Sequence, residues 1–200
     1  MSDPIEFYFD FSSPYSYIAS ELIDALAEKY GRSVKWRPMM MGVAFQKTGL
    51  PPLINVPLKG EYSRRDFSRS ARFHGLPFVQ PEKFPIATLA AARAYYWLHE
   101  QDCERARRFA HGVFRAYWAE GRDISDLAVV RQIAAGLGID QEALAEAVAK
   151  PEVKERLKQE TDGAIARGLF GVPYMLVDGE PFWGADRLPQ IEKWLQTGGF

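Results

Sequence analysis

Patterns typical of β-strands occur only at the two ends of this 200-residue chain, and the long middle has helical patterns. Residues 5–11 form a short run of apolar and aromatic side chains that predicts a buried strand, and residues 34–37 predict a second one. Apolar residues at helical spacing over residues 14–30 predict a helix between them that ends at Gly31. A strand, a helix and a parallel strand in this order form a right-handed βαβ unit.

Strand patterns return only near the C-terminus. Residues 173–177 and 180–183 flank the dipeptide Asp178-Gly179, which strongly favours a two-residue hairpin turn. A last helix is predicted over residues 187–195. The residues between the two strand-bearing ends predict helices at 62–75, 88–100, 103–120, 126–137, 141–149 and 152–167.

The order of the elements is therefore β-α-β, then a helical block, then β-β-α. This order predicts an α/β protein with a thioredoxin fold into which an all-helical domain is inserted. Residues 1–60 and 165–200 would form the thioredoxin-like domain, and residues 61–164 the inserted helical domain. Residues 39–60 are rich in glycine and proline, and we expect an irregular connection there, of a length that is usually functional.

Composition narrows the class of protein. Hydrophobic residues make up 47% of the chain, which predicts a well-buried globular fold. A net charge of −1 gives no basic footprint for nucleic acid or a membrane surface, and no segment is apolar over a bilayer-spanning length. The single cysteine, Cys103, excludes an internal disulfide, and the three histidines lack metal-binding spacing, so we expect no metal site. The N-terminal residues show no secretion-signal pattern, and we expect a cytoplasmic protein.

The segment Ser13-Pro14-Tyr15-Ser16 follows the first strand and opens the first helix. A thioredoxin-type fold carries its Cys-x-x-Cys motif at this place, and here both cysteine positions are serine. A helix N-terminus stabilises a thiolate through its unpaired N–H groups and its positive partial charge. Without a cysteine, the thiolate must come from an external thiol such as glutathione. The local alternative is that Ser13 only caps the helix, with Pro14 at its first position.

Two further motifs lie near the C-terminus. In thioredoxin folds the proline at the position of Pro173 is cis and faces the redox motif, which lets the backbone of Val172 pair with an extended peptide. The alternative is an ordinary trans proline at a strand edge. Asp186 lies at the start of the last helix, where a carboxylate suits the α-ammonium of a γ-glutamyl group. It could equally be a helix-capping acid.

These motifs together, residues 9–17, 170–173 and 182–188, give the chain a recognisable likeness. The chain resembles 2-hydroxychromene-2-carboxylate isomerases, which are bacterial relatives of kappa-class glutathione transferases in the DsbA-like superfamily. The resemblance spans essentially the whole chain, including the helical insertion and the segment 57–60. Three separated motifs in the right order are far more specific than any one of them.

The resemblance implies a glutathione site. Ser13 would donate a hydrogen bond to the sulfur as the catalytic residue, and Val172, ahead of the cis Pro173, would bind the cysteinyl backbone. Lys59 would contact glutathione, and Asn55 corresponds less securely to a second loop residue that does so.

At the γ-glutamyl end the resemblance implies that Asp186 binds glutathione. Its neighbour is commonly Asn or Ser in the family and is Ala185 here, which leaves only a backbone N–H at that position.

The resemblance also implies an activity. It is the glutathione-dependent interconversion of 2-hydroxychromene-2-carboxylate and trans-o-hydroxybenzylidenepyruvate, a cis-trans isomerisation in naphthalene-type aromatic catabolism. The partner would be a small aromatic enone carboxylate, and family members are generally dimeric, so we expect a homodimer. Because no histidine base lies near Ser13 in the sequence, we interpret this serine as a hydrogen-bond donor and not as a nucleophile.

Two other hypotheses remain open at this point. One is a broader kappa-like glutathione transferase or peroxidase that uses the same site on other electrophiles. The other is a non-catalytic DsbA-like protein that captures extended peptides at the edge formed by Val172 and Pro173. Glutathione binding separates the last hypothesis from the first two, and substrate turnover separates the first two from each other.

Overall fold

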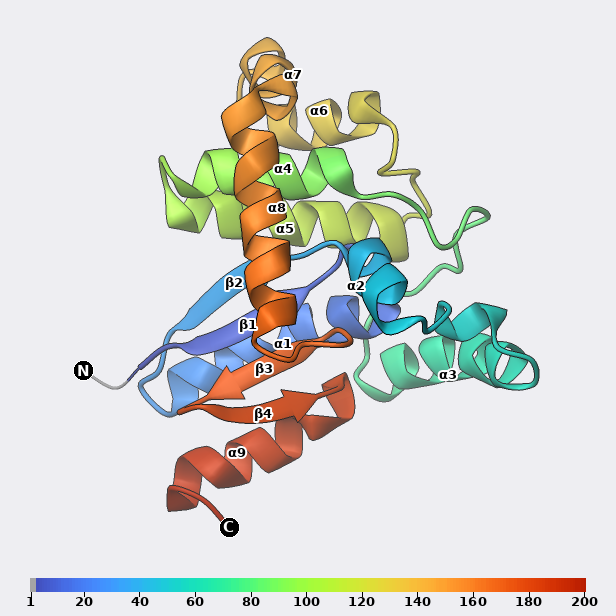
Figure 1. The fold of residues 1–200 in the computed structure, drawn as a ribbon, viewed down its shortest axis with the longest axis vertical. Coiled ribbons are helices and arrows are strands. Elements are labelled where there is room, and N and C mark those ends of the chain that lie inside the picture. The colour runs from blue at the N-terminus through green and yellow to red at the C-terminus, as the bar shows by residue number, and fades with distance from the viewer. Residues whose placement is uncertain (1–2) are drawn as a thin grey trace.

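The computed structural model of the protein describes residues 3–200. Met1 and Ser2, which belong to the N-terminal segment where we expect no secretion signal, lie outside the described residues. A four-stranded sheet has the order β2-β1-β3-β4, and only the β1–β2 pair is parallel (Figure 1). The strands are β1 (Ile5–Phe9), β2 (Val34–Pro38), β3 (Tyr174–Val177) and β4 (Glu180–Trp183).

The aromatic side chains of the central strand β1 are buried on both faces of the sheet. Phe7 is paired in register with Trp36 of β2 and Met175 of β3, and all three side chains are buried. Alternate residues of a strand point to opposite faces, so Tyr8 belongs to a second cluster on the other face of the sheet. Helix α1 (Pro14–Lys29) connects β1 to β2 and completes the predicted βαβ unit. The fold is a thioredoxin fold with a helical insertion, as predicted.

The inserted helices lie beside one another at one end of the sheet, and the last of them, α8, runs back across it (Figure 1). Aspartates begin three of them: Asp102, Asp126 and Asp140 each accept a backbone N–H of the first turn. The five helices are α4 (Leu89–His99), α5 (Cys103–Trp118), α6 (Leu127–Gly136), α7 (Gln141–Ala149) and α8 (Pro151–Ala166).

Buried aromatic side chains attach these helices to the sheet through their polar ends. The hydroxyls of Tyr95 and Tyr96 donate to the backbone oxygens of Trp36 (3.0 Å) and Pro38 (2.7 Å), at the end of β2. The indole of Trp118 donates to the backbone oxygen of Phe11 at 2.9 Å. Each large ring buries apolar area and also satisfies a backbone carbonyl, so these contacts attach the helices to the end of β2 and to the turn after β1.

The prediction of an irregular connection over residues 39–60 is wrong. The structure has α2 (Met41–Thr48) and the 3-10 turn η1 (Leu53–Asn55) there, and the following helix α3 (Lys59–Phe73) begins before residue 62. The first N–H of α2 donates to the carboxylate of Asp10 at 2.9 Å, a contact that no local pattern reveals. The helix ends at Gly49, whose φ of 71° is a conformation that glycine adopts readily.

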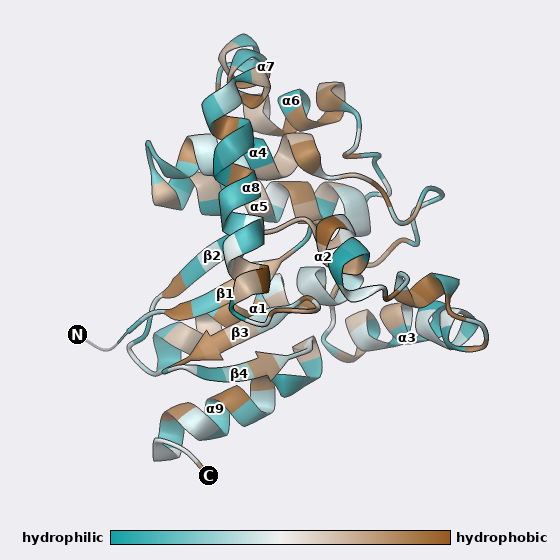
Figure 2. Cartoon of the chain, viewed as in Figure 1, coloured by the Kyte–Doolittle hydropathy of each residue, from teal (hydrophilic) through white to brown (hydrophobic). Residues whose placement is uncertain are grey.

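One hydrophobic cluster runs from the strands and α1 into α4 to α7, so the two ends of the chain and its middle share a core. In Figure 2 the outward face of α8 is mainly hydrophilic, as expected for a helix at the surface. Helix α3 packs against α1 and η1. The boundaries 1–60 with 165–200 and 61–164 stay a prediction. Among residues 3–200, no helix combines the length and apolar character needed to cross a bilayer.

Candidate functional site

Ser13 occupies the N-cap of α1. Its Oγ accepts the N–H of Ser16 at 3.1 Å, and Pro14 takes the first helical position. Ser13 therefore caps α1, and Pro14 fits the position that proline favours in a first turn. Capping uses an oxygen lone pair of Ser13 and leaves its hydroxyl hydrogen available. In this structure the hydroxyl donates to the backbone oxygen of Val172 across a long Oγ–O distance of 3.5 Å. Capping and donation to a ligand are thus compatible roles.

The two serines of the motif differ in accessibility. Ser13 is partly exposed, whereas Ser16 is completely buried. The Oγ of Ser16 has no hydrogen-bond partner within residues 3–200. A ligand that approaches the N-terminus of α1 from solvent can therefore reach the hydroxyl of Ser13 but not that of Ser16.

The Val172–Pro173 bond is cis, as the thioredoxin fold predicts, and it lies against Ser13. Pro173 also accepts the N–H of Gly184 at 3.0 Å, which joins this bond to the loop after β4. A Cβ at Gly171 would lie 2.5 Å from Nε1 of Trp183, so a residue without a side chain is required there. The backbone before the cis bond is thus held directly under the Trp183 ring.

Asp186 and Ala185 lie in η2 (Ala185–Arg187), which packs against α1. Asp186 does not cap α9 (Leu188–Thr197): the capping residue is Arg187, without a side-chain cap bond. The Asp186 side chain is 73% exposed and pairs with Arg187 at 3.4 Å. Gly184 has a φ of 112°, a backbone conformation that residues with a side chain rarely adopt, so glycine is favoured there. Ala185 is buried, and because its side chain has no polar atom, the backbone N–H is the donor it has for a ligand.

Asn55 and Lys59 lie on a neighbouring segment, at the end of η1 and the start of α3. Both side chains are exposed, and within the described residues neither contacts Ser13, Val172 or Asp186 through a hydrogen bond or ion pair. Between them, Leu58 (φ 67°, ψ −48°) is the centre of a γ-turn in which the N–H of Lys59 donates to Pro57 at 2.8 Å. The structure therefore gathers Ser13, Val172, Pro173, Ala185 and Asp186 at the end of α1, whereas Asn55 and Lys59 lie on the segment that leads into α3, a helix that packs against α1.

Sequence reasoning missed the buried carboxylate beneath this site. Asp10 is 5% exposed and accepts the N–H groups of Ser12 and Met41 and the hydroxyl of Thr88, each at 2.9 Å. Burial raises the pKa of Asp10, and the three hydrogen bonds oppose this effect. The carboxylate thereby joins the turn before α1 to the starts of α2 and α4. An acid inside an otherwise aromatic strand run was the signal that could have found it.

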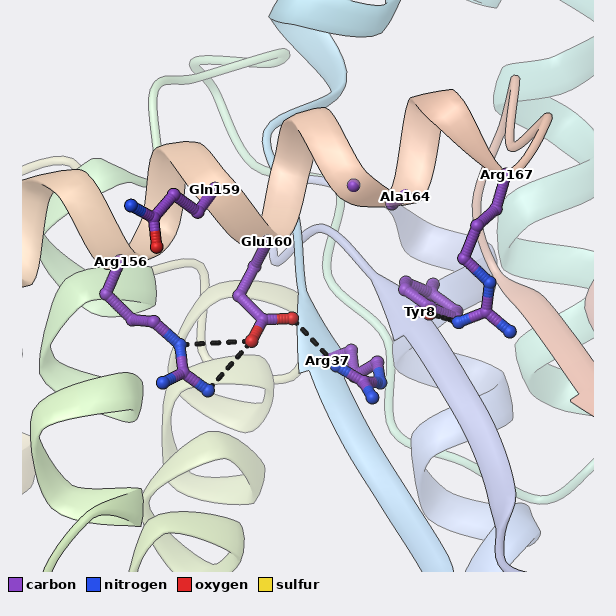
Figure 3. A pocket seen from close by; sticks show the side chains of 8 residues that line it. Tyr8, Arg37, Arg156, Gln159, Glu160, Ala164 and Arg167 are labelled. Atoms are coloured by element: carbon purple, nitrogen blue, oxygen red, sulfur yellow. Dashed lines mark hydrogen bonds and ion pairs between the residues drawn. The ribbon is translucent and has the colours of Figure 1, made fainter.

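A second concave region lies between α8 and the strands β1 and β2 (Figure 3). It has a volume of about 400 Å³ and contains none of the predicted site residues. Arg37 pairs with both Glu6 (2.8 Å) and Glu160 (2.7 Å). Glu160 also forms an ion pair with Arg156 at 2.8 Å, and Glu6 also forms one with Arg167 at 2.7 Å. Each arginine that lines this groove has a carboxylate partner, so the groove is a network that attaches α8 to the sheet.

Comparisons with known proteins agree with this geometry. The sequence model of the DSBA-like thioredoxin domain matches residues 4–196. The chain is 32% identical to the 2-hydroxychromene-2-carboxylate isomerase of Sphingobium xenophagum, with 98% of this chain and 99% of the relative covered. The chain belongs to the DSBA-like thioredoxin domain family, alongside the 2-hydroxychromene-2-carboxylate isomerases. The predicted resemblance is confirmed.

A solved structure and a second relative are also similar to this chain over nearly its whole length. A solved structure of a 2-hydroxychromene-2-carboxylate isomerase superimposes with a TM-score of 0.87 at 28% identity, covering 96% of this chain and 94% of that one. A relative from Caenorhabditis elegans, named glutathione S-transferase kappa 2, is 28% identical over 96% of this chain and 91% of its own length. Both matches extend through the helical insertion, so the whole architecture is shared with them.

Proposed function

We propose that this protein is a glutathione-dependent isomerase that interconverts 2-hydroxychromene-2-carboxylate and trans-o-hydroxybenzylidenepyruvate. The observation that carries the proposal is the Ser13 hydroxyl at the N-terminus of α1, facing the cis Val172–Pro173 bond in a site without cysteine. The 32% identity to a protein named for this reaction supports the choice of substrate.

The chemistry of the surrounding groups fits glutathione. Glutathione offers a thiol, two carboxylates and one ammonium group, and this end of α1 offers a hydroxyl, the cation Lys59 and the anion Asp186. The Lys59 and Asp186 side chains are exposed to solvent, and the exposed pair of Asp186 with Arg187 can be exchanged for a ligand. Lys59, with Asn55 beside it, would hold a carboxylate, whereas Asp186 would hold the α-ammonium, with the N–H of Ala185 as a further donor.

Ser13 would keep the bound thiol ionised. A hydrogen bond to a charged group contributes about 1.5–3 kcal/mol, which corresponds to a pKa decrease of about one to two units. The N-terminus of α1 would act in the same direction. Val172 would pair with the cysteinyl backbone as an added strand does and would hold the sulfur against Ser13.

Bound glutathione would supply a thiolate that adds reversibly to the conjugated carbon of the enone, leaving a rotatable single bond until elimination restores the alkene. The chain's own task is to stabilise the negative sulfur without consuming it. Ser13 suits this task because no imidazole contacts its hydroxyl within the described residues, so it remains a donor and does not become a competing nucleophile.

The setting of the enzyme is part of the same proposal. Glutathione and reduced thiols are characteristic of the cytosol, which makes the cytoplasm the fitting compartment. The reaction belongs to aromatic catabolism of the naphthalene type, and we propose a homodimer as the working form.

The test is spectrophotometric turnover of 2-hydroxychromene-2-carboxylate with and without glutathione. Turnover should require glutathione and fall about 10- to 100-fold in Ser13→Ala, because the lost hydrogen bond raises the thiol pKa. Ser33→Ala, which alters an exposed serine that makes no side-chain hydrogen bond within the described residues, is the matched control and should keep full activity. Turnover that is independent of glutathione, or unaffected by Ser13→Ala, would overturn the proposal.

A kappa-like transferase is the second candidate, favoured by the 28% identity to the C. elegans protein named glutathione S-transferase kappa 2. It would share the whole glutathione site and differ in the electrophile. Glutathione binding without isomerisation, together with conjugation of an aryl halide, would select this candidate. Absence of glutathione binding would instead favour capture of extended peptides at Val172 and Pro173.

A further inference from the structure

One hydrogen bond joins the two helices that carry the proposed glutathione residues. The hydroxyl of Tyr15 donates to Oδ2 of Asp66 at 2.5 Å. Tyr15 lies in the first turn of α1, two residues after Ser13. Asp66 lies in α3, seven residues after Lys59, which begins that helix. The bond therefore connects the end of α1 that holds Ser13 to the helix that holds Lys59.

The ionisation of the pair makes this bond strong. Burial would raise the pKa of Asp66, but hydrogen bonds from Tyr15 and Arg69 lower it below its usual value. Burial and the nearby Asp66 raise the pKa of Tyr15 well above its usual range. At neutral pH a neutral phenol thus donates to a carboxylate, and such charge-assisted bonds are about twice as strong as neutral ones.

The attachment of α3 to the rest of the molecule is narrow. Its buried side consists of a single stripe, Gly60, Ser63, Phe67 and Ala71, and its other residues face solvent or lie partly exposed. Within that stripe, Phe67 packs edge-on against Tyr15 at 5.2 Å between ring centroids and against Phe84 at 5.8 Å. Aromatic packing of this kind tolerates small rotations, whereas a hydrogen bond fixes direction.

A small rotation of α3 matters because Lys59 is far from the attachment. Seven residues of helix correspond to roughly 10 Å along the axis between Asp66 and Lys59. The preceding γ-turn at Leu58 and the close approach of Gly60 to the backbone oxygen of Ile54 join Lys59 to η1, so the start of α3 and Asn55 move together.

We propose that Tyr15 and Asp66 are positioning residues that orient α3, and with it Lys59 and Asn55, toward Ser13. The pair sets the affinity for glutathione and leaves the chemical step unchanged. This inference rests on the proposed function, because it assigns a purpose to α3 in the same site. Neither residue is among the groups that we expect to touch glutathione.

Tyr15→Phe tests the proposal, since it removes only the hydroxyl and keeps the ring that packs on Phe67. We expect the KM for glutathione to rise about tenfold, as loss of a bond to a charged group implies, with kcat changed less than about twofold. The thiolate absorbance of saturated enzyme should be unchanged. The matched control is Tyr30→Phe, at the other end of α1, where the hydroxyl donates to Glu192 of α9 at 3.1 Å; its KM should be that of the parent.

Substitutions of Asp66 complete the test. Asp66→Ala should weaken affinity at least as much as Tyr15→Phe, because it also removes the contacts of Asp66 with Arg69 and Ser70, and adding Tyr15→Phe to it should cause no further loss. Asp66→Asn keeps an acceptor oxygen but not the charge, and should recover about half of the lost binding free energy. A fall in kcat at unchanged KM, additive effects in the double variant, or an equal effect of Tyr30→Phe would overturn the proposal.

A readout without glutathione separates this inference from the proposed function. Amide hydrogen exchange over residues 59–66 should become faster in Tyr15→Phe and remain at the parent rate in Tyr30→Phe. If the parent enzyme bound no glutathione, the proposed function would fail, and the exchange rates would still decide whether Tyr15 holds α3. Unchanged exchange in Tyr15→Phe would overturn the positioning role even if glutathione binds.

Discussion

The groove between α8 and the sheet and the exposed end of α1 use their polar groups in opposite ways. In the groove, Arg37 joins Glu6 to Glu160, and the outer arginines Arg156 and Arg167 each share one of these carboxylates. At the end of α1, the Ser13 hydroxyl is uncharged and the Asp186 carboxylate is 73% exposed beside Arg187. Lys59, at the start of α3, is also exposed.

This difference shows why concavity and charge alone do not locate a binding site. A ligand anion entering the groove would have to displace a carboxylate that already pairs with two arginines. Separating a partly buried ion pair lowers the stability of the fold, because it leaves a charge without its partner. A ligand at the end of α1 meets the Ser13 hydroxyl, which has only a long 3.5 Å bond to Val172, and the backbone N–H of Tyr15, which has no hydrogen-bond partner within the described residues. We therefore assign stability to the groove and chemistry to the end of α1.

Arg37→Ala should show the largest difference between the two regions, because it should lower stability without affecting glutathione binding. The side chain is 18% exposed and holds two carboxylates, so its loss should lower the free energy of unfolding by about 2 kcal/mol; each carboxylate keeps one other arginine, which limits the effect. Urea denaturation measures this loss. Arg108→Ala, an exposed arginine of α5 without an ion pair in the described residues, should change stability by less than about 0.5 kcal/mol.

The same variant also tests whether the groove takes part in glutathione binding. Folded Arg37→Ala protein should retain the glutathione affinity and kcat of the parent, because the groove lies outside the proposed site. A folded variant that no longer binds glutathione would show that the groove takes part in binding and would refute the division of roles.

Strong acid should weaken the groove, because Glu6 is held ionised there. The hydrogen bond from Arg167, with help from Tyr8 and Arg37 and against burial, lowers the pKa of Glu6 from its ordinary 4.5 to about 2. The stabilisation is therefore complete above pH 4.5 and is lost as the pH falls from 4.5 toward 2. Because the group is partly solvated, we discount the full linkage value and expect a contribution of about 1–2 kcal/mol.

Glu6→Gln isolates this contribution. Its unfolding free energy should be below that of the parent at neutral pH, and the difference should shrink as the pH is lowered through 4.5. Urea denaturation at several pH values measures both proteins under the same conditions. A difference that stays constant down to pH 3 would mean that ionisation of Glu6 does not stabilise the fold.

Local patterns sufficed for most of the architecture. The hairpin around Asp178-Gly179 and the amphipathic helices follow from residue spacing and turn chemistry, and α7 has the predicted bounds. Helix α2 was missed for a physical reason. Its eight residues are flanked by glycine and proline, and its first N–H is satisfied by Asp10, which lies 31 positions earlier. Tertiary contacts, and not local propensity, make that helix.

The candidate site shows the same limit. The approach of Ser13 to the cis Val172–Pro173 bond follows from motifs that a thioredoxin fold always brings together. The hydrogen bond between Tyr15 and Asp66 joins residues 51 positions apart and depends on how α3 lies against α1. No pattern within either segment encodes that placement. Motifs therefore predicted the end of α1 itself, and the structure was needed to find what orients its surroundings.

Asp186→Asn tests the proposed glutathione site directly and has the smallest expected effect. The carboxylate is 73% exposed and, among residues 3–200, pairs only with its neighbour Arg187, so stability should be unchanged. The dissociation constant for glutathione should rise about five- to tenfold. Calorimetric titration measures the affinity. Glu180→Gln, which alters an exposed acid at the start of β4, is the control and should bind like the parent.

A glutathione analogue without the α-amino group identifies which charge Asp186 recognises. If the carboxylate holds the ammonium, the analogue should bind the parent and Asp186→Asn with equal affinity, because the partner of the carboxylate is then missing in both cases. A variant that still weakens binding of the analogue would place Asp186 against another part of the ligand. An unchanged affinity for glutathione itself would remove this residue from the site and leave Ser13, Val172 and the α3 segment as its only recognition elements.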